Sequence, residues 1–234
     1  MRYIFSLLLY LLSGLTFLIF GPFLLIVIFI YPKSLYLIVI PFCQLMITTF
    51  GCTIKSNKKV PLNETYVIMA NHVSFLDVFA IPTVFTGKFT AVAASKNFNI
   101  PVYATILKKL KVVSIDRSNR DQSIKGIKQA ESLIQKGYHV VVLPEGTRTK
   151  DGKLGSFKKG GFHLAVNTKT KILPIVTKGL FKIKPLNRWT IMPGRIIINI
   201  VSIASFIFII MFVGYPSFIY CIKVTQAIFS NLLI

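Results

Sequence analysis

This chain has very few acidic side chains. Only 7 of its 234 residues are aspartate or glutamate, against 28 lysines and arginines, so the formal net charge is +21. A surplus of this size favours anionic partners, such as nucleic acid, an anionic lipid surface or phosphorylated substrates. Three of the carboxylates, Asp77, Asp116 and Glu145, fall inside short polar blocks that end apolar stretches. These blocks are therefore the first places to look for a site.

Cysteine and histidine are also scarce. Cys43, Cys52 and Cys221 form no Cys-x-x-Cys pair and lie in or beside apolar segments. This pattern predicts small hydrophobic residues in a reducing compartment, with no disulfide or metal framework. His139 and His163 are isolated and form no plausible metal cluster with the available carboxylates. We therefore expect no metal site.

The sequence lacks the basic helix and the aromatic signature that are typical of nucleic-acid-binding proteins. It is instead rich in apolar residues, with 53% of the chain hydrophobic, which is more than an ordinary soluble domain contains. Positive charge combined with this apolar content favours lipid over nucleic acid as the anionic partner. The length allows one domain of ordinary size plus membrane segments.

The N-terminal region has the pattern of a membrane anchor. Residues 4–31 contain no charge, and a bilayer span needs only ~20 apolar residues. The run is long for a signal peptide and lacks an A-x-A-like cleavage site. After a short break a second apolar run covers residues 35–52. Arg2 before the first run and a lysine cluster after the second predict a helical hairpin over residues 1–54 with both ends cytoplasmic. A hairpin that dips into one leaflet fits equally well.

Residues 55–202 have the pattern of a globular α/β domain. Short, continuous runs of β-branched residues alternate with helical patterns, as expected of strands covered on both faces. This alternation predicts a mostly parallel or mixed sheet flanked by helices, with right-handed crossovers. The expected strands are residues 66–70, 89–94, 111–115, 139–143, 171–176 and 195–201. The clearest helix has one apolar stripe, a cap at Ser118 or Asp121 and a stop at Gly137; the stripe is Ile124, Ile127, Leu133 and Ile134.

The C-terminal segment, residues 203–234, is apolar again. Lys223 is its only charge, and Gly214-Tyr215-Pro216 interrupts it. We expect an apolar tail that is able to embed in the membrane.

Polar blocks follow three of the expected strands. His72 follows the first, Asp116-Arg117 another, and Glu145–Arg148 a third. Ligands of parallel α/β sheets bind beyond the carboxyl ends of the strands, so these blocks are expected to meet in one site. A base, an orienting acid and several cations there predict acyl or phosphoryl chemistry on an anionic substrate. Loop polarity and helix capping are the alternative for either block alone.

His72 and Asp77 need a particular local structure to meet. Five residues advance an ideal helix by about 500°, so the two would not share a helix face. They can meet if His72 lies in a loop and the helix begins at Ser74, where Ser-x-x-Asp resembles a capping box. Asp77 would then fix the imidazole tautomer and leave one nitrogen to take a proton from a hydroxyl. In the rival interpretation Asp77 only caps the helix. Ser74 lacks the G-x-S-x-G context of a nucleophile.

In combination these blocks resemble the 1-acylglycerol-3-phosphate acyltransferase family of glycerolipid acyltransferases. The N-H-x-S-x-x-D motif of that family matches residues 71–77, and its E-G-T-R motif matches residues 145–148 in full. Further family segments resemble residues 94–96, 113–117, 156–160 and 172–176. The resemblance covers about residues 58–202, and the apolar C-terminal segment departs from it.

The resemblance implies a role for each site residue. His72 would act as general base on a glycerol hydroxyl that attacks an acyl thioester directly, without an acyl-enzyme. Asp77 would orient His72 and stabilise its cation. Arg148 would hold the acceptor phosphate, and Glu145 would orient cations rather than remove protons. The implied phosphate-binding set is Arg148, Thr147, Gly146, Glu145, Arg117 and Lys96.

The implied reaction is acyl transfer to 1-acylglycerol 3-phosphate, which forms phosphatidic acid for phospholipid biosynthesis. It needs no cofactor, and either acyl-CoA or acyl-carrier protein would serve as co-substrate. The expected partners are membrane lipids and the lysophospholipid acceptor, with no nucleic acid, and the catalytic domain would face the cytoplasm. Two alternatives stay open: glycerol 3-phosphate or another lysophospholipid as acceptor, and a basic membrane-lipid-binding protein without catalysis.

Overall fold

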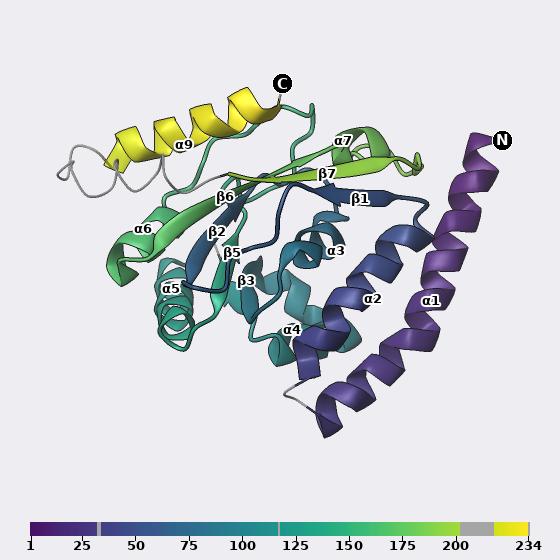
Figure 1. The fold of residues 1–234 in the computed structure, drawn as a ribbon, viewed down its shortest axis with the longest axis horizontal. Helices are drawn as coiled ribbons and strands as arrows, with labels where there is room; N and C mark the ends of the chain where they lie inside the picture. The colour runs from purple at the N-terminus through teal and green to yellow at the C-terminus, as the bar shows by residue number, and fades with distance from the viewer. Residues whose placement is uncertain (32–33, 117, 202–217, 234) are drawn as a thin grey trace.

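The structure is a computed structural model that describes residues 1–31, 34–116, 118–201 and 218–233. Its centre is a seven-stranded sheet with the order β1-β7-β6-β2-β5-β3-β4. Neighbouring strands are parallel except β6 and β7, which are antiparallel, so the expected mixed sheet is confirmed. The strands are β1 (Thr53–Ser56), β2 (Tyr66–Ala70), β3 (Phe89–Ala94), β4 (Val113–Ile115), β5 (His139–Val142), β6 (Lys171–Lys178) and β7 (Arg195–Ile200) (Figure 1).

All six expected strands occur. β6 runs two residues beyond its expected end, β5 and β7 each end one residue early, and two further details differ. β4 begins at Val113 rather than at residue 111, because Lys111 adopts a left-handed conformation with φ 56° that turns the chain before the strand. β1 was not expected: it is a short edge strand that pairs with β7 and has no buried residue. A four-residue strand of this kind carries too little apolar pattern to be found in the sequence.

The strands send alternate side chains to two separate cores. From β2, Ile68 and Ala70 pack into one core, whereas Val67 and Met69 pack into the other. All five residues of β2 are buried, which explains why its sequence is continuously apolar. In β7, which lies next to the edge strand β1, buried and exposed side chains alternate: Ile196 is buried and Ile197 is exposed.

Helices cover both faces of the sheet (Figure 1). On one face lie α1 (Arg2–Ile30), α2 (Leu35–Thr49), α3 (Asp77–Ala80) and the 3₁₀ helix η2 (Ile81–Val84). On the other lie α5 (Arg120–Gln135), α6 (Gly160–Thr168) and α9 (Phe218–Leu233). The remaining helical segments are η3 (Ser95–Asn99), α4 (Pro101–Lys109) and α7 (Leu180–Ile183).

Helix α5 differs from expectation at its cap and along its stripe. Asn119, and neither Ser118 nor Asp121, is the N-cap, and its Oδ1 accepts the Gln122 amide at 3.1 Å. Ile124 is 45% exposed, because the buried face of α5 passes instead through Gly126, Ala130, Leu133 and Ile134. The stop at Gly137 is confirmed, since this residue follows the helix with φ 79°.

The two N-terminal helices form an antiparallel hairpin but have different surroundings (Figure 1). α1 is long and apolar enough to cross a membrane, and many of its large apolar side chains face outward. α2 has only 15 residues, and Val39, Cys43, Met46 and Ile47 are buried in the core of the domain. α2 is therefore part of the domain, and α1 supplies the exposed apolar surface.

The expected apolar tail is described only in part, since residues 203–217 and 234 lie outside the described residues. Helix α9 from this segment packs on the sheet (Figure 1). Its Phe229 is fully buried and contacts Phe157 with ring centroids 5.4 Å apart. Its Gln226 Nε2 donates to the Gly155 carbonyl at 3.2 Å. This helix therefore braces the loop that follows β5.

Candidate active site

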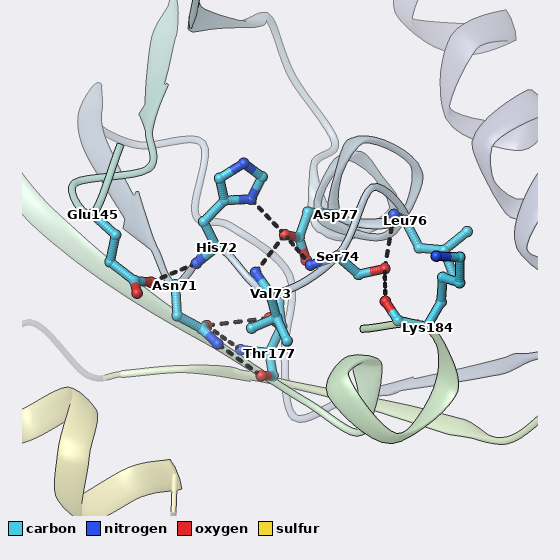
Figure 2. A network of polar contacts seen from close by, with 9 residues as sticks. All are labelled: Asn71, His72, Val73, Ser74, Leu76, Asp77, Glu145, Thr177 and Lys184. Carbon is cyan, nitrogen blue, oxygen red and sulfur yellow. Dashed lines mark hydrogen bonds and ion pairs between the residues drawn. The ribbon is translucent and has the colours of Figure 1, made fainter. Parts of the chain in front are cut away.

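His72 and Asp77 meet in the loop that follows β2, as the sequence predicts (Figure 2). His72 Nδ1 lies 2.8 Å from Asp77 Oδ2, and the two side chains are 20% and 1% exposed. With Asp77 ionised, the proton of a neutral imidazole is assigned to Nδ1, which leaves Nε2 as a proton acceptor. The geometry therefore suits a general base oriented by a buried carboxylate.

The Asp77 carboxylate also organises the loop around it. Its Oδ2 accepts the amides of Val73 at 2.8 Å and Ser74 at 3.0 Å, whereas Oδ1 is buried without a hydrogen-bond partner among the described residues. Helix α3 begins at Asp77 and not at Ser74, so the expected start was wrong by three residues. The bond to the Ser74 amide is nevertheless the one that the acid of a capping box makes. Asp77 thus holds both the loop and the imidazole.

Ser74 and Asn71 hold the loop on either side of His72 (Figure 2). Ser74 is fully buried; its hydroxyl donates to the Lys184 carbonyl at 2.8 Å and accepts the Leu76 amide at 3.3 Å. The Asn71 side chain donates from Nδ2 to the Thr177 carbonyl at 3.0 Å and accepts the Thr177 amide at 2.8 Å. An asparagine side chain thereby continues the pairing of β2 with β6 beyond the last paired residue. The Ser74 hydroxyl thus bonds to backbone groups, and to no general base among the residues that the structure describes.

Glu145 has a role different from the one expected. It is only 6% exposed, and its two oxygens accept the backbone amides of His72 and Gly155, each at 2.7 Å. Among the described residues it forms no ion pair with a lysine or arginine, so it orients backbone rather than cations. Burial raises the pKa of Glu145, while the two amides and nearby His72 lower it. The role differs from the expected one because Glu145 is buried, and its position in the sequence does not reveal that burial.

The rest of the Glu145–Arg148 block curves around His72. The Thr149 amide donates to the His72 carbonyl at 2.9 Å, so both backbone polar groups of His72 are held by this segment. Gly146 makes the turn with φ 77°. The half-buried Arg148 and the exposed Thr147 line a cavity of about 540 Å³ beside the loop, together with Glu145. Arg148 has no ion-pair partner in the described part of the chain.

The other predicted cations are less closely tied to the site. Lys96 is exposed in η3, just beyond the carboxyl end of β3, and makes no hydrogen bond to the His72 loop within the described ranges. Arg117 lies outside the described residues. Its neighbour Asp116 accepts the amide and hydroxyl of Ser118 at 3.0 and 2.6 Å, and these bonds lower the pKa of Asp116. Asp116 therefore stabilises a turn.

Lys184 is a site residue that the sequence analysis missed. Its carbonyl accepts the Ser74 hydroxyl, and its ammonium donates to the carbonyls of Pro185 and Arg188. Burial lowers the pKa of Lys184, and the charges of Arg148 and Arg188 lower it further. No motif marks this lysine, because it lies in the connection after β6 and reaches the site only through the fold.

The described residues contain no group of three or more His, Cys, Asp or Glu side chains that could hold a metal ion.

Comparison with known proteins identifies relatives. The profile of the acyltransferase family, described as Acyltransferase, matches residues 51–178. The chain is 35% identical over 138 residues to a chloroplastic 1-acyl-sn-glycerol-3-phosphate acyltransferase of Arabidopsis thaliana, which covers 58% of this chain and 38% of that protein. It is 32% identical over 117 residues to 1-acyl-sn-glycerol-3-phosphate acyltransferase alpha of Homo sapiens, with 50% and 41% covered. The chain thus spans about two fifths of the length of these curated relatives.

A solved structure shares the fold over nearly the whole chain. It is the 1-acyl-sn-glycerophosphate acyltransferase of Thermotoga maritima, with a TM-score of 0.81 and 24% identity, over 99% of this chain and 98% of that one.

The bridge made by Glu145 leads to a test of stability. A glutamine at this position offers one acceptor oxygen, so Glu145→Gln leaves either the His72 or the Gly155 amide buried without its partner. We expect a loss of about 1–3 kcal/mol in the free energy of unfolding, measured by thermal unfolding of the purified protein in detergent. Glu131→Gln is the control, because Glu131 accepts one exposed hydrogen bond from Asn167 that glutamine can also accept. Equal stability of the two variants would contradict the bridging role.

Proposed function

The chain belongs to the acyltransferase family, and from this membership we propose that it transfers a fatty acyl group from an acyl thioester to the free hydroxyl of 1-acylglycerol 3-phosphate. The product would be phosphatidic acid. The observation that carries the proposal is the 2.8 Å contact between His72 Nδ1 and the buried Asp77 Oδ2. It lies beside a cavity lined by Arg148, which forms no ion pair with any residue that the structure describes. The names of the relatives support the choice of acceptor.

The proposed mechanism is a direct acyl transfer. His72 Nε2 takes the proton of the acceptor hydroxyl while its oxygen attacks the thioester carbonyl. The C–O bond forms, the C–S bond breaks, and the proton passes from His72 to the departing thiolate. Asp77 stabilises the imidazolium between these steps, and its burial makes that charge interaction stronger than it would be in water. No acyl-enzyme is needed, which agrees with the engaged hydroxyl of Ser74.

Arg148 is the proposed ligand of the acceptor phosphate. A guanidinium binds phosphate oxygens through two parallel hydrogen bonds, and this one has no carboxylate partner in the described ranges. The backbone of Gly146 and Thr147 would assist it, and Lys96 and Arg117 remain proposals for the same role. Glu145 would contribute by holding the Gly155 and His72 backbone.

We also propose that α1 inserts into the membrane and that the catalytic domain faces the cytoplasm. Large apolar side chains are exposed along the length of α1, including Leu18 at 72% and Phe23 at 60%. An aqueous environment would leave this surface unfavourably hydrated. Placement at the membrane also brings the site to an acceptor that is itself a lipid.

The base is tested by acyl transfer to a panel of acceptors. His72→Ala should lose at least about a hundredfold in rate, because a positioned general base contributes ~10²–10⁴-fold. Asp77→Asn should reduce turnover more than binding. The wild type should prefer 1-acylglycerol 3-phosphate over glycerol 3-phosphate and over other lysophospholipids. Near-normal rates in a folded His72→Ala protein would refute the mechanism, and preference for another acceptor, or no transfer at all, would replace the proposed function.

Arg148 is tested by titrating the two substrates separately. Arg148→Ala removes a charged hydrogen-bonding partner worth roughly 1.5–3 kcal/mol, so acceptor kcat/KM should fall about ten- to a hundredfold. The apparent KM of the donor should move little. Arg148→Lys should recover only part of the loss, because lysine cannot form the two-bonded contact. An unchanged acceptor kcat/KM in a thermally intact Arg148→Ala protein would eliminate the phosphate role.

The location is tested by fractionation. The protein should stay in the membrane pellet after high-salt or alkaline washing, because apolar insertion is not screened by ions as surface charge is. Trypsin should cut the lysine-rich loop at residues 150–159 only when it is added from the cytoplasmic side of sealed vesicles. Release by salt alone would show that the basic surface holds the protein, and cleavage from the opposite side would reverse the proposed orientation.

A further inference from the structure

The loop between α7 and β7 contacts both the catalytic loop and helix α1. We name its residues 184–191 the strap. At one end the Lys184 carbonyl accepts the Ser74 hydroxyl at 2.8 Å (Figure 2). At the other end the Ile191 amide donates to the buried Ser6 hydroxyl of α1 at 3.1 Å. That hydroxyl also lies 2.9 Å from the Arg2 carbonyl and 3.2 Å from the Ile191 carbonyl. The strap therefore connects α1 to the loop of His72 through hydrogen bonds.

Arg188 links the two ends of the strap. Its guanidinium donates to three backbone carbonyls, those of Lys182 at 2.5 Å, Ile183 at 2.8 Å and Thr190 at 3.2 Å. Lys182 and Ile183 are the last residues of α7, where helix carbonyls lack partners inside the helix. The carbonyl of Arg188 itself accepts the Lys184 ammonium. Arginine has five N–H donors in one plane, so a single side chain can bind several carbonyls at once.

The catalytic end of the strap is two contacts away from the proposed base. The Ser74 amide donates to Asp77 Oδ2 at 3.0 Å, and the same oxygen lies 2.8 Å from His72 Nδ1. Asp77 Oδ1 has no hydrogen-bond partner among the described residues, so the contacts at Oδ2 fix the carboxylate. Because Lys184 holds the side chain of Ser74, a movement of the strap would displace one of the amides that hold Asp77.

The other end of the strap packs on the N-terminal part of α1. Trp189 stacks on Tyr3 with ring centroids 5.6 Å apart, and the Trp189 carbonyl accepts the Tyr10 hydroxyl at 2.7 Å. Tyr3, Ser6 and Tyr10 are spaced by three and four residues, so they lie on one face of the helix. Further along α1, Ser13 instead donates to Thr49 Oγ1 of α2 at 3.2 Å. One part of α1 thus binds the strap, and the next binds α2.

Resting on the proposed function, we propose that the strap holds the catalytic loop in place and that Arg188 is the positioning residue that keeps the strap closed. With the strap closed, the Lys184 carbonyl lies where the Ser74 hydroxyl can reach it, and His72 stays on Asp77. With the strap open, the loop loses a hydrogen bond and the base shifts relative to the substrates. A shift of ~1 Å can cost about a hundredfold in rate. The strap therefore acts on turnover rather than on substrate binding.

The test compares two serines on the same helix. Ser6→Ala removes the acceptor of the Ile191 amide at the α1 end of the strap. Ser13→Ala is the matched control, because it removes a buried hydrogen bond of α1 that goes to Thr49 and not to the strap. Arg188→Gln opens the strap at its centre, and Arg188→Lys keeps the charge without the planar set of donors. All proteins are placed in lipid nanodiscs, and their thermal unfolding is recorded.

Hydrogen exchange reports on the catalytic loop without any reaction. Exchange of the amides of residues 71–77 is followed by mass spectrometry. We expect it to be about five- to tenfold faster in Arg188→Gln and about fivefold faster in Ser6→Ala, because the loss of one hydrogen bond changes an opening equilibrium by roughly fivefold. Arg188→Lys should lie between Arg188→Gln and the wild type. Ser13→Ala should match the wild type, and peptides from α5 should exchange equally in all of the proteins.

Kinetics then test the positioning role. Rates are normalised to folded protein and are measured well below the unfolding temperature. For Arg188→Gln kcat should fall about tenfold, which corresponds to a displacement of the base by less than ~1 Å. The KM values for the acceptor and for the donor should stay near those of the wild type, because the substrate contacts are unchanged. Arg188→Lys should recover part of kcat.

Three results would overturn the inference. Exchange of residues 71–77 could be unchanged in the strap variants. Ser13→Ala could accelerate it as much as Ser6→Ala, which would indicate a general loosening of α1. The kcat of folded Arg188→Gln could equal that of the wild type. If Arg188→Gln does not fold, Ser6→Ala against Ser13→Ala decides by the same measurements. Faster exchange in the strap variants of a protein that transfers no acyl group would instead refute the proposed function and leave the hold of the strap on the loop standing.

Discussion

The carboxylate of Glu145 joins the parts of the site to one another. Its two oxygens accept the amides of His72, in the loop after β2, and of Gly155, in the loop after β5. Gly155 is also bound by Gln226 of α9, so a continuous set of hydrogen bonds runs from the C-terminal helix to His72, the proposed base. Both bonds are 2.7 Å long and part-buried, and a carboxylate can offer one oxygen to each of two amides. Glu145 is therefore the hydrogen-bonding partner that the loop of His72 and the loop after β5 have in common.

The few carboxylates of the chain mostly bind backbone or polar groups. Asp77, Asp116, Glu145 and Asp151 each accept backbone amides, and Glu131 accepts a side-chain amide. Glu64 forms the one lysine–carboxylate pair among the described residues. Within the described ranges, most lysines and arginines therefore have no carboxylate within 4.0 Å. A positive surplus of this size favours binding to an anionic lipid surface.

The helices on the two faces of the sheet give the site two different kinds of surroundings. α1 and α2 extend one core outward to an exposed apolar helix, while α5, α6 and α9 close the other face (Figure 1). The acceptor proposed above is a lipid. The exposed apolar helix α1 would provide such a substrate with a suitable environment on one side of the domain.

Much of this could be predicted from the sequence, because the deciding patterns are local. Continuous apolar runs marked six of the seven strands, and the spacing from His72 to Asp77 was enough to expect their contact once a loop separated them. Three local features were not predicted: the start of α3, the cap of α5 and strand β1. The first two depend on which of several nearby polar side chains binds the helix amides, and β1 depends on the presence of its partner strand β7. Only the tertiary structure decided the role of Glu145 and the place of Lys184. The role of a charged side chain depends on how deeply it is buried and on which backbone groups bind it. Those groups belong to segments that are distant in the sequence, and the order of strands in the sheet brings them together.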